Sequence, residues 1–138
     1  MKKIIYPTEI GVSVVHPTDE LSIELTAKKA VPNGVEYKII EHTDIPSDRL
    51  FRNAWEYDFN KNGSITINLT KAKVITKDRL RADRKPLLEA QDVLFMKAQE
   101  SGADTTAIVA EKVRLRDITK DADTCTTTDQ LKALSCEE

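Results

Sequence analysis

Aromatic residues and long apolar runs are both scarce in this sequence. Aromatics make up 5% of the 138 residues, too few for the stacked rings with which RNA-recognition sheets hold bases. No apolar run approaches the roughly 18 residues of a membrane-spanning helix. The run Ile4–Tyr6 stops at Pro7 and is shorter than the about 7–15 apolar residues of a secretory signal. These absences predict a soluble protein that does not enter a membrane.

Motifs of the common enzyme classes are absent as well. The sequence contains no GxSxG, no phosphate-binding Walker loop, no GxGxxG and no HExxH. Its only histidines, His16 and His42, lie near Asp19 and Asp44, as a general base lies near its orienting carboxylate. Histidines beside a helix start or after a strand are nevertheless more often structural or solvated. We therefore predict no catalytic residues and no cofactor.

Metal-ligating patterns are incomplete. Cys125 and Cys136 have no CxxC spacing and no neighbouring histidines, which indicates free thiols of a reducing compartment. The segment beginning at Asp58 matches the first half of an EF-hand loop, with oxygen ligands at its odd positions and Gly63 at position six. Its twelfth position is Leu69, where calcium needs a bidentate glutamate. A hairpin turn is favoured over a calcium site, and no metal ligand is predicted.

The net charge of −2 excludes a protein that attracts nucleic acid by its overall field. Hydrophobic residues form 40% and charged residues 32% of the chain, an ordinary globular balance. A chain of this length suits one domain or two small lobes. It buries enough surface to fold without metal or disulfides.

The first half of the chain predicts β-structure that opens with a hairpin. Two β-branched runs, Ile4–Tyr6 and Ile10–Val15, flank a short turn. A short helix is then expected from about Leu21 to Val31, with Thr18 or Asp19 as its N-cap.

A strand, a helical turn and a second hairpin are expected next. Val35–Ile40 is rich in β-formers, and a helical turn should run from Ser47 towards Trp55. The dipeptide Asn62-Gly63 between the β-type runs Glu56–Phe59 and Ser64–Ile67 is a strong hairpin signal. Trp55 is expected in the core, bridging the two lobes.

The second half predicts helices. Asn68 is a good N-cap and Gly102 a good C-terminal stop, with Pro86 expected to kink or split the helix between them. One face carries Leu80, Leu87, Leu94 and Ala98, which predicts that Leu94 is buried.

Two further helices complete the second half. A helix capped by Asp104 should run to Ile118 and form a helical hairpin with Leu87–Gly102. The sequence Thr127-Thr128-Asp129-Gln130 fits a capping box before a last short helix that carries Leu131.

The resulting fold class is α+β. A small β-rich N-terminal lobe, residues 1–67, has hairpins plus a short helix. A C-terminal helical hairpin region, residues 68–138, follows it, and the two lobes could also form one joint domain.

A basic stretch in the long helix supplies the candidate binding site. Seven bases and two acids lie between Lys71 and Lys85. Charges of both signs alternate there and no aromatic interleaves them, which favours a protein partner over nucleic acid; a plain solvated helix face remains the alternative. The candidate partner-binding residues are Arg79, Arg81, Arg84, Arg114 and Arg116.

Several segments resemble a known family. In the first half they are Val31–Ile40, Ile45–Arg49 and Phe51–Glu56; in the second half they are Asp92–Ala98, Gly102 and Lys112–Asp117. Together they resemble small proteins encoded among the tail genes of tailed bacteriophages, such as tail assembly chaperones and tail-fibre-associated proteins. This chain has Thr119 where the family has a proline, and its Phe59–Gly63 turn is longer.

The resemblance implies a non-enzymatic phage accessory protein. It would bind a phage tail or tail-fibre protein in the host cytoplasm during assembly, and the family carries no catalytic residues to transfer. One alternative is a minor structural component retained in the virion. Another is a small regulator that binds nucleic acid or calcium, and a homo-oligomer is also left open.

Overall fold

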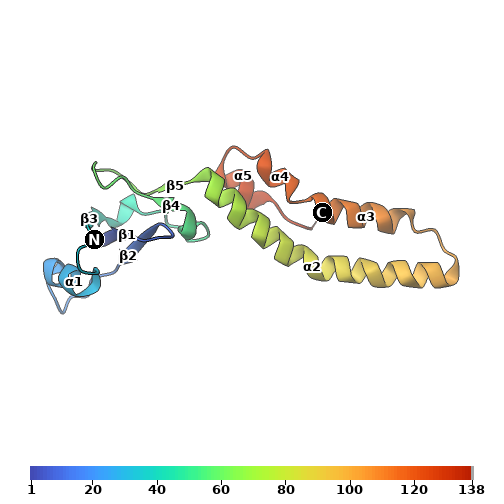
Figure 1. Ribbon diagram of the computed structural model, residues 1–138, viewed down its shortest axis with the longest axis horizontal. Coiled ribbons are helices and arrows are strands. Elements are labelled where there is room, and N and C mark those ends of the chain that lie inside the picture. The colour runs from blue at the N-terminus through green and yellow to red at the C-terminus, as the bar shows by residue number, and fades with distance from the viewer. Residues whose placement is uncertain (138) are drawn as a thin grey trace. The chain divides into compact units, whose positions relative to one another are not determined.

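The computed structural model describes residues 1–137 and confirms the α+β class (Figure 1). The chain forms two compact units, one of residues 1–71 and one that begins at Ala72. The division predicted between residues 67 and 68 falls beside the start of the long helix α2, Leu69–Ser101.

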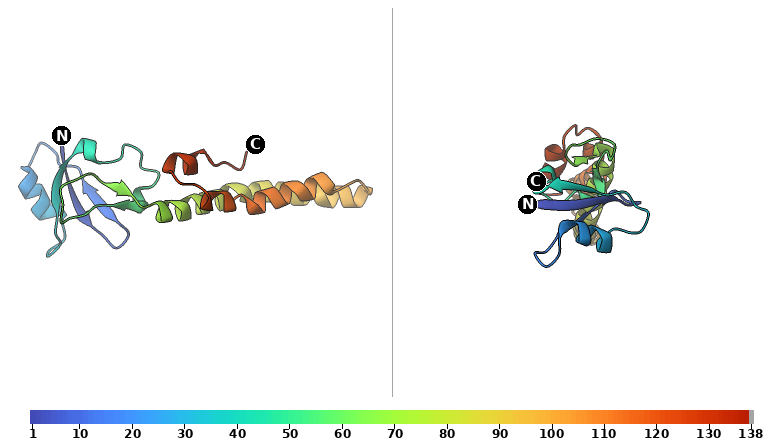
Figure 2. Two further views of the ribbon diagram at one scale, coloured as in Figure 1. Left: turned by 90° about the horizontal axis from the view of Figure 1, so that it is seen from above. Right: turned by 90° about the vertical axis from the view of Figure 1, so that its left-hand side faces the viewer.

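A three-stranded antiparallel sheet forms the centre of the first unit (Figure 2). Its strands are β1 (Lys2–Pro7), β2 (Val12–Val15) and β3 (Lys38–Glu41), in the order β2-β1-β3. The β1–β2 hairpin confirms the predicted opening hairpin, and β3 begins three residues later than predicted. Since β1 pairs on both sides, β2 and β3 are the two edges of the sheet.

Helix α1, Ile23–Ala30, confirms the predicted helix but not its cap. Ser22 is the N-cap, and its Oγ accepts a hydrogen bond from the Leu25 backbone N–H at 3.3 Å. Thr18 and Asp19 lie too far upstream, because a capping oxygen reaches only the second or third N–H of its helix. Fully buried Ala27 packs the helix against Ile4 of the sheet.

A second hairpin pairs β4 (Trp55–Glu56) with β5 (Thr66–Ile67). The predicted hairpin is confirmed, but the tight Asn62-Gly63 turn is wrong, because no positive φ is found at Gly63 and a type I′ turn requires one. The loop that connects the two strands is instead fixed by a hydrogen bond outside the hairpin, in which the Ile65 N–H donates to the Asp44 carbonyl at 2.9 Å.

Short 3-10 turns at His42–Asp44 and Arg52–Ala54 complete the first unit. The helical turn predicted to begin at Ser47 is confined to the second of these. Trp55, only 4% exposed, packs with Ile5, Ile40 and Ile65. The tryptophan predicted to bridge two lobes is thus a core residue of the first unit.

Helix α2 continues through Pro86 as one helix, so the split is wrong, but its axis bends near the middle of the helix (Figure 1), as the other predicted outcome, a kink, requires. Asn68 caps its start, accepting from the Lys71 N–H at 3.0 Å, and Gly102, with φ +70°, ends it, both as predicted. Proline removes one backbone hydrogen bond of the helix, but contacts with α3 fix the helical turns on either side of it. Arg84 bonds to the end of α3 (Thr106–Asp117), and Asp92 pairs with Lys112 of α3 at 2.5 Å.

The helices after α2 fold back along it. Helix α3 completes the predicted helical hairpin, and α4 (Lys120–Asp123) and α5 (Thr128–Ala133) follow (Figure 1). The capping box is confirmed in a modified form. Thr127 Oγ1 accepts from the Gln130 N–H at 3.2 Å, while Gln130 Oε1 accepts from the N–H of Thr126 at 2.7 Å.

The buried core of the second unit contains Leu80, Leu115, Ile118 and Cys136. The prediction that Leu94 belongs to this core is wrong, because its side chain is 46% exposed. A straight α-helix drifts by about 20° per seven residues, so Leu94 lies about 40° away from Leu80. Ala98 is five full turns from Leu80 and returns to the buried direction, with 9% exposure.

Candidate functional site

The five candidate arginines divide into those that hold the second unit together and those that face solvent. Arg79 belongs to the first group. Its Nη2 donates to the backbone oxygens of Leu131 and Leu134, at 3.1 and 2.9 Å. These carbonyls lie at the end of α5, where backbone oxygens have spare acceptor capacity, although the Leu131 oxygen also accepts from the Leu134 N–H at 3.3 Å. Arg79 therefore fixes α5 against α2.

Arg84 does the same for α3. Its Nη1 donates to the Arg116 carbonyl at 2.7 Å and approaches the Leu115 carbonyl at 3.4 Å. A cation near the C-terminus of a helix also interacts favourably with the helix dipole. The guanidinium of Arg84 is consequently part of the contact between α2 and α3.

Arg114 is bound to groups of the second unit. It forms a two-pronged contact with Glu111, at 2.6 and 2.9 Å, and donates to the Cys136 carbonyl at 2.9 Å. The hydrogen bond from Arg114 is the main cause that lowers the pKa of Glu111. Burial is the main cause that raises the pKa of the nearby Cys136 thiol, so this cysteine stays protonated and poorly nucleophilic.

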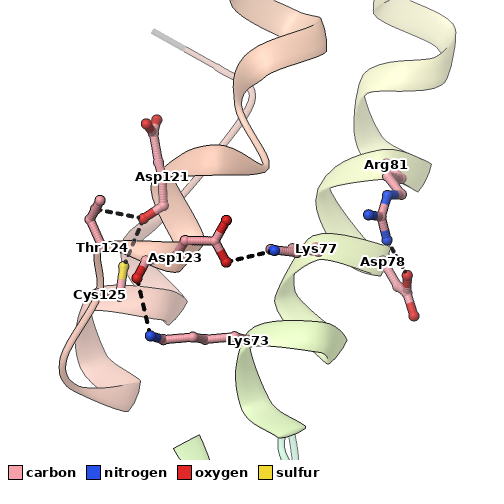
Figure 3. Close-up of polar contacts among 8 residues, drawn as sticks. All are labelled: Lys73, Lys77, Asp78, Arg81, Asp121, Asp123, Thr124 and Cys125. Carbon is pink, nitrogen blue, oxygen red and sulfur yellow. Dashed lines mark hydrogen bonds and ion pairs between the residues drawn. The ribbon is translucent and has the colours of Figure 1, made fainter. Parts of the chain in front are cut away.

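Lysines of the basic stretch are bound to α4 (Figure 3). Lys77 Nζ lies 2.6 Å from Asp123 Oδ1, and Lys73 Nζ donates to the Asp123 carbonyl at 3.1 Å. The bond from Lys77 is the main cause that lowers the Asp123 pKa. Most of the predicted basic face is thus used inside the unit.

Arg81 and Arg116 are the candidates whose side chains are exposed. Arg81 forms a 2.8 Å ion pair with Asp78, on the side of α2 away from Lys77 (Figure 3). An exposed pair of this kind contributes at most about 1 kcal/mol. Arg81 can therefore turn towards a partner at the cost of this weak ion pair alone, and the exposed side chain of Arg116 can turn as well.

We expect Arg84→Gln to lower the free energy of unfolding by about 1–3 kcal/mol, because the carbonyl oxygens at the end of α3 lose a charged donor. Urea denaturation followed by far-UV circular dichroism measures this change. Arg81→Gln, on the same helix, serves as the control and should change stability by less than about 0.5 kcal/mol. Equal losses in the two variants would contradict the assignment of Arg84.

The Asp58 loop uses its oxygens within the protein. Asp58 Oδ1 accepts from the Asn60 N–H at 3.0 Å, and Asn62 Oδ1 accepts from Lys38 Nζ at 3.4 Å. Among residues 1–137, no group of three or more histidine, cysteine or acidic side chains is placed to hold a metal ion.

Asp44, the acid near His42 in the sequence, has a hydrogen-bond partner of its own. It accepts from the Ser64 hydroxyl at 3.0 Å. His16 and His42 line one cavity of about 140 Å³ together with Arg49. Burial is the main cause that lowers the His16 pKa, with further contributions from Lys3, Arg49 and His42. A lowered pKa favours the neutral form of His16, and Arg49 brings a positive charge to the cavity.

Sequence reasoning missed Arg49 and Arg52 as candidate binding residues. Both line a neighbouring cavity of about 230 Å³ beside β2. They are the only arginines in the first 71 residues. Their closeness in a segment otherwise free of arginine was the one feature of the sequence that could have indicated a binding site.

No protein-family model, no curated protein and no solved structure matches this chain. Within residues 1–137, no helix is both long enough and apolar enough to cross a lipid bilayer.

Proposed function

We propose that this protein is a non-enzymatic accessory protein that binds another protein. The partner we propose is a phage tail or tail-fibre protein, met in the host cytoplasm during assembly. The phage context rests on the resemblance of the sequence segments alone. The binding role is supported by the surface of the α2–α3 hairpin.

Exposed aliphatic side chains on this hairpin are the observation that carries the proposal. Seven of the described ones are 38–58% exposed: Val74, Leu87, Val93, Leu94, Met96, Val109 and Val113. Isolated exposed apolar residues are normal on a protein surface, whereas neighbouring ones are typical of an interaction surface. Leu87 and Leu94, seven residues apart, lie on the same side of α2. Methionine and arginine are also enriched at protein interfaces, and Arg81 and Arg116 lie on the same two helices.

The fitting partner offers an apolar strip flanked by carboxylates. Exposed arginines pair with carboxylates in a fixed, two-pronged geometry, which sets the register of the complex. A nucleic-acid partner is less well supported, because Arg79, Arg84 and Arg114 already donate to backbone oxygens of the unit. Those arginines are not available to phosphates.

Charge reversal at Arg81 and Arg116 tests the proposal. Arg84 is unsuitable, because its replacement would disturb the contact between α2 and α3. In a pull-down from infected cells, Arg81→Glu with Arg116→Glu should reduce recovery of a tail component by about tenfold or more, since two ion pairs become repulsive. The circular dichroism spectrum should not change.

The matched control is Lys28→Glu with Lys29→Glu, which makes the same charge change on exposed positions of α1. Recovery equal to wild type in the arginine variant would overturn the proposal. If the wild-type protein bound duplex DNA at about 150 mM salt and the arginine variant did not, the alternative function, a nucleic-acid-binding regulator, would replace the proposed one. Mass spectrometry of purified particles distinguishes a transient assembly factor from a retained virion component.

A further inference from the structure

The outer edge of β2 carries backbone groups that do not pair with β1. In an antiparallel pair, every second residue directs its N–H and C=O towards the neighbouring strand and the others direct theirs away. Pro7 has no N–H and stands opposite Val12, so this is a non-hydrogen-bonded pair. The same alternation makes Val14, opposite Ile5, a second one. The backbone groups of Val12 and Val14 therefore point outward from the sheet.

A cavity of about 230 Å³ runs along this edge, and both valines line it. The β1–β2 turn closes one end of it. A Cβ placed on Gly11 would lie 2.8 Å from the backbone oxygen of Trp55, so only glycine allows the turn to approach β4 this closely. The cavity thus has a defined shape and an edge strand as one wall.

The opposite wall is rich in hydrogen-bond donors. Arg49, Arg52 and Asn53 come from the segment before β4, and no carboxylate is found among the described residues of the lining. A ligand with negatively charged oxygens could accept hydrogen bonds from the donors of this wall.

A second cavity adjoins the first along β2. The cavity that holds His16 and His42 shares Val14, Arg49 and Trp55 with it. Both cavities therefore follow the same strand, from the Gly11 turn to the residue after β2. This length of edge, about four residues, matches a short extended peptide of roughly 13 Å.

We propose that the outer edge of β2 takes up an extended acidic segment of the partner protein as an additional strand. Its backbone pairs with Val12 and Val14, and its carboxylates pair with Arg49 and Arg52. Strand addition gives affinity through main-chain hydrogen bonds, and side-chain pockets give specificity. The inference rests on the proposed function, because it assumes a protein partner, but it concerns a different surface.

The test uses the whole protein and a capped synthetic octapeptide of alternating glutamate and threonine. Trp55 is the only tryptophan, so its fluorescence reports binding at this cavity directly. The peptide should cause a saturable change in emission. Arg49→Gln with Arg52→Gln should weaken binding by about tenfold or more, because two charge-assisted contacts are lost. Lys28→Gln with Lys29→Gln removes the same charge from α1 and should leave binding unchanged.

Three further probes separate strand addition from simple anion binding. A lysine–threonine octapeptide should not bind. The glutamate peptide with alternate amides N-methylated keeps its charge but cannot add a strand, and should not bind either. Equal binding of the N-methylated peptide, or the same emission change with sodium phosphate, would show a small-anion site and overturn the proposal, as would no response to the glutamate peptide. None of these results alters the pull-down with the Arg81 and Arg116 variants, so the two proposals fail separately.

Discussion

Replacing Leu80 with alanine should lower the free energy of unfolding by about 2–5 kcal/mol, the usual range for a buried leucine. Leu80 is fully buried and packs with Leu115, Ile118 and Cys136. Its truncation removes apolar contacts and leaves a cavity between α2 and α3 that rigid helices fill poorly. Urea denaturation of the full chain, followed by far-UV circular dichroism, gives the change.

Leu94→Ala is the matched control for Leu80→Ala. It is the same substitution on the same helix, two heptads further along, but Leu94 is 46% exposed. We expect its effect to stay below about 1 kcal/mol, because little new cavity forms at a half-exposed site. If Leu94→Ala destabilised the protein as much as Leu80→Ala, the assignment of the buried face of α2 would be wrong.

Ile5→Ala should cost a similar amount in the first unit, about 2–5 kcal/mol. Ile5 is fully buried at the centre of β1 and contacts the cluster that contains Ile40, Trp55 and Ile65. The central strand has a neighbour on both sides, so β1 has little freedom to shift into the space. Because the cluster includes the only tryptophan, its fluorescence during denaturation reports the loss in this unit.

Ile10→Ala provides the comparison for Ile5→Ala. Ile10 lies in the turn between β1 and β2 and is 63% exposed. Its truncation should change the stability by less than about 0.5 kcal/mol, as is usual for exposed positions. A comparable loss in both variants would show that the turn is packed against apolar groups and not exposed.

Several arginines of this protein stabilise its fold and do not form a basic binding surface. Backbone oxygens at the ends of α3 and α5 accept hydrogen bonds from Arg84 and Arg79 of α2. Helix ends leave such oxygens without intrahelical partners, and a long guanidinium from a neighbouring helix can supply the donor. A cluster of bases in a sequence is therefore weak evidence for a ligand until the neighbouring helix ends are known.

The sequence by itself determined the features that depend on local geometry. Asn68 and Thr127 cap their helices, and Gly102 ends α2 with a positive φ, because a capping oxygen or a left-handed residue acts within one turn of the chain. The alternation of β-branched residues likewise gave the opening hairpin, whose strands are neighbours in the sequence.

Only the tertiary structure decided which surfaces are free. The offset of about 40° between Leu80 and Leu94 follows from their spacing, but whether a side chain at that angle is covered depends on where α3 packs against α2. Arg49 and His16 lie 33 positions apart in the sequence, and the paths of β2 and the loop after β3 bring them to one cavity. Backbone oxygens have the same chemistry at every residue, so no sequence pattern shows which of them will accept a hydrogen bond from an arginine.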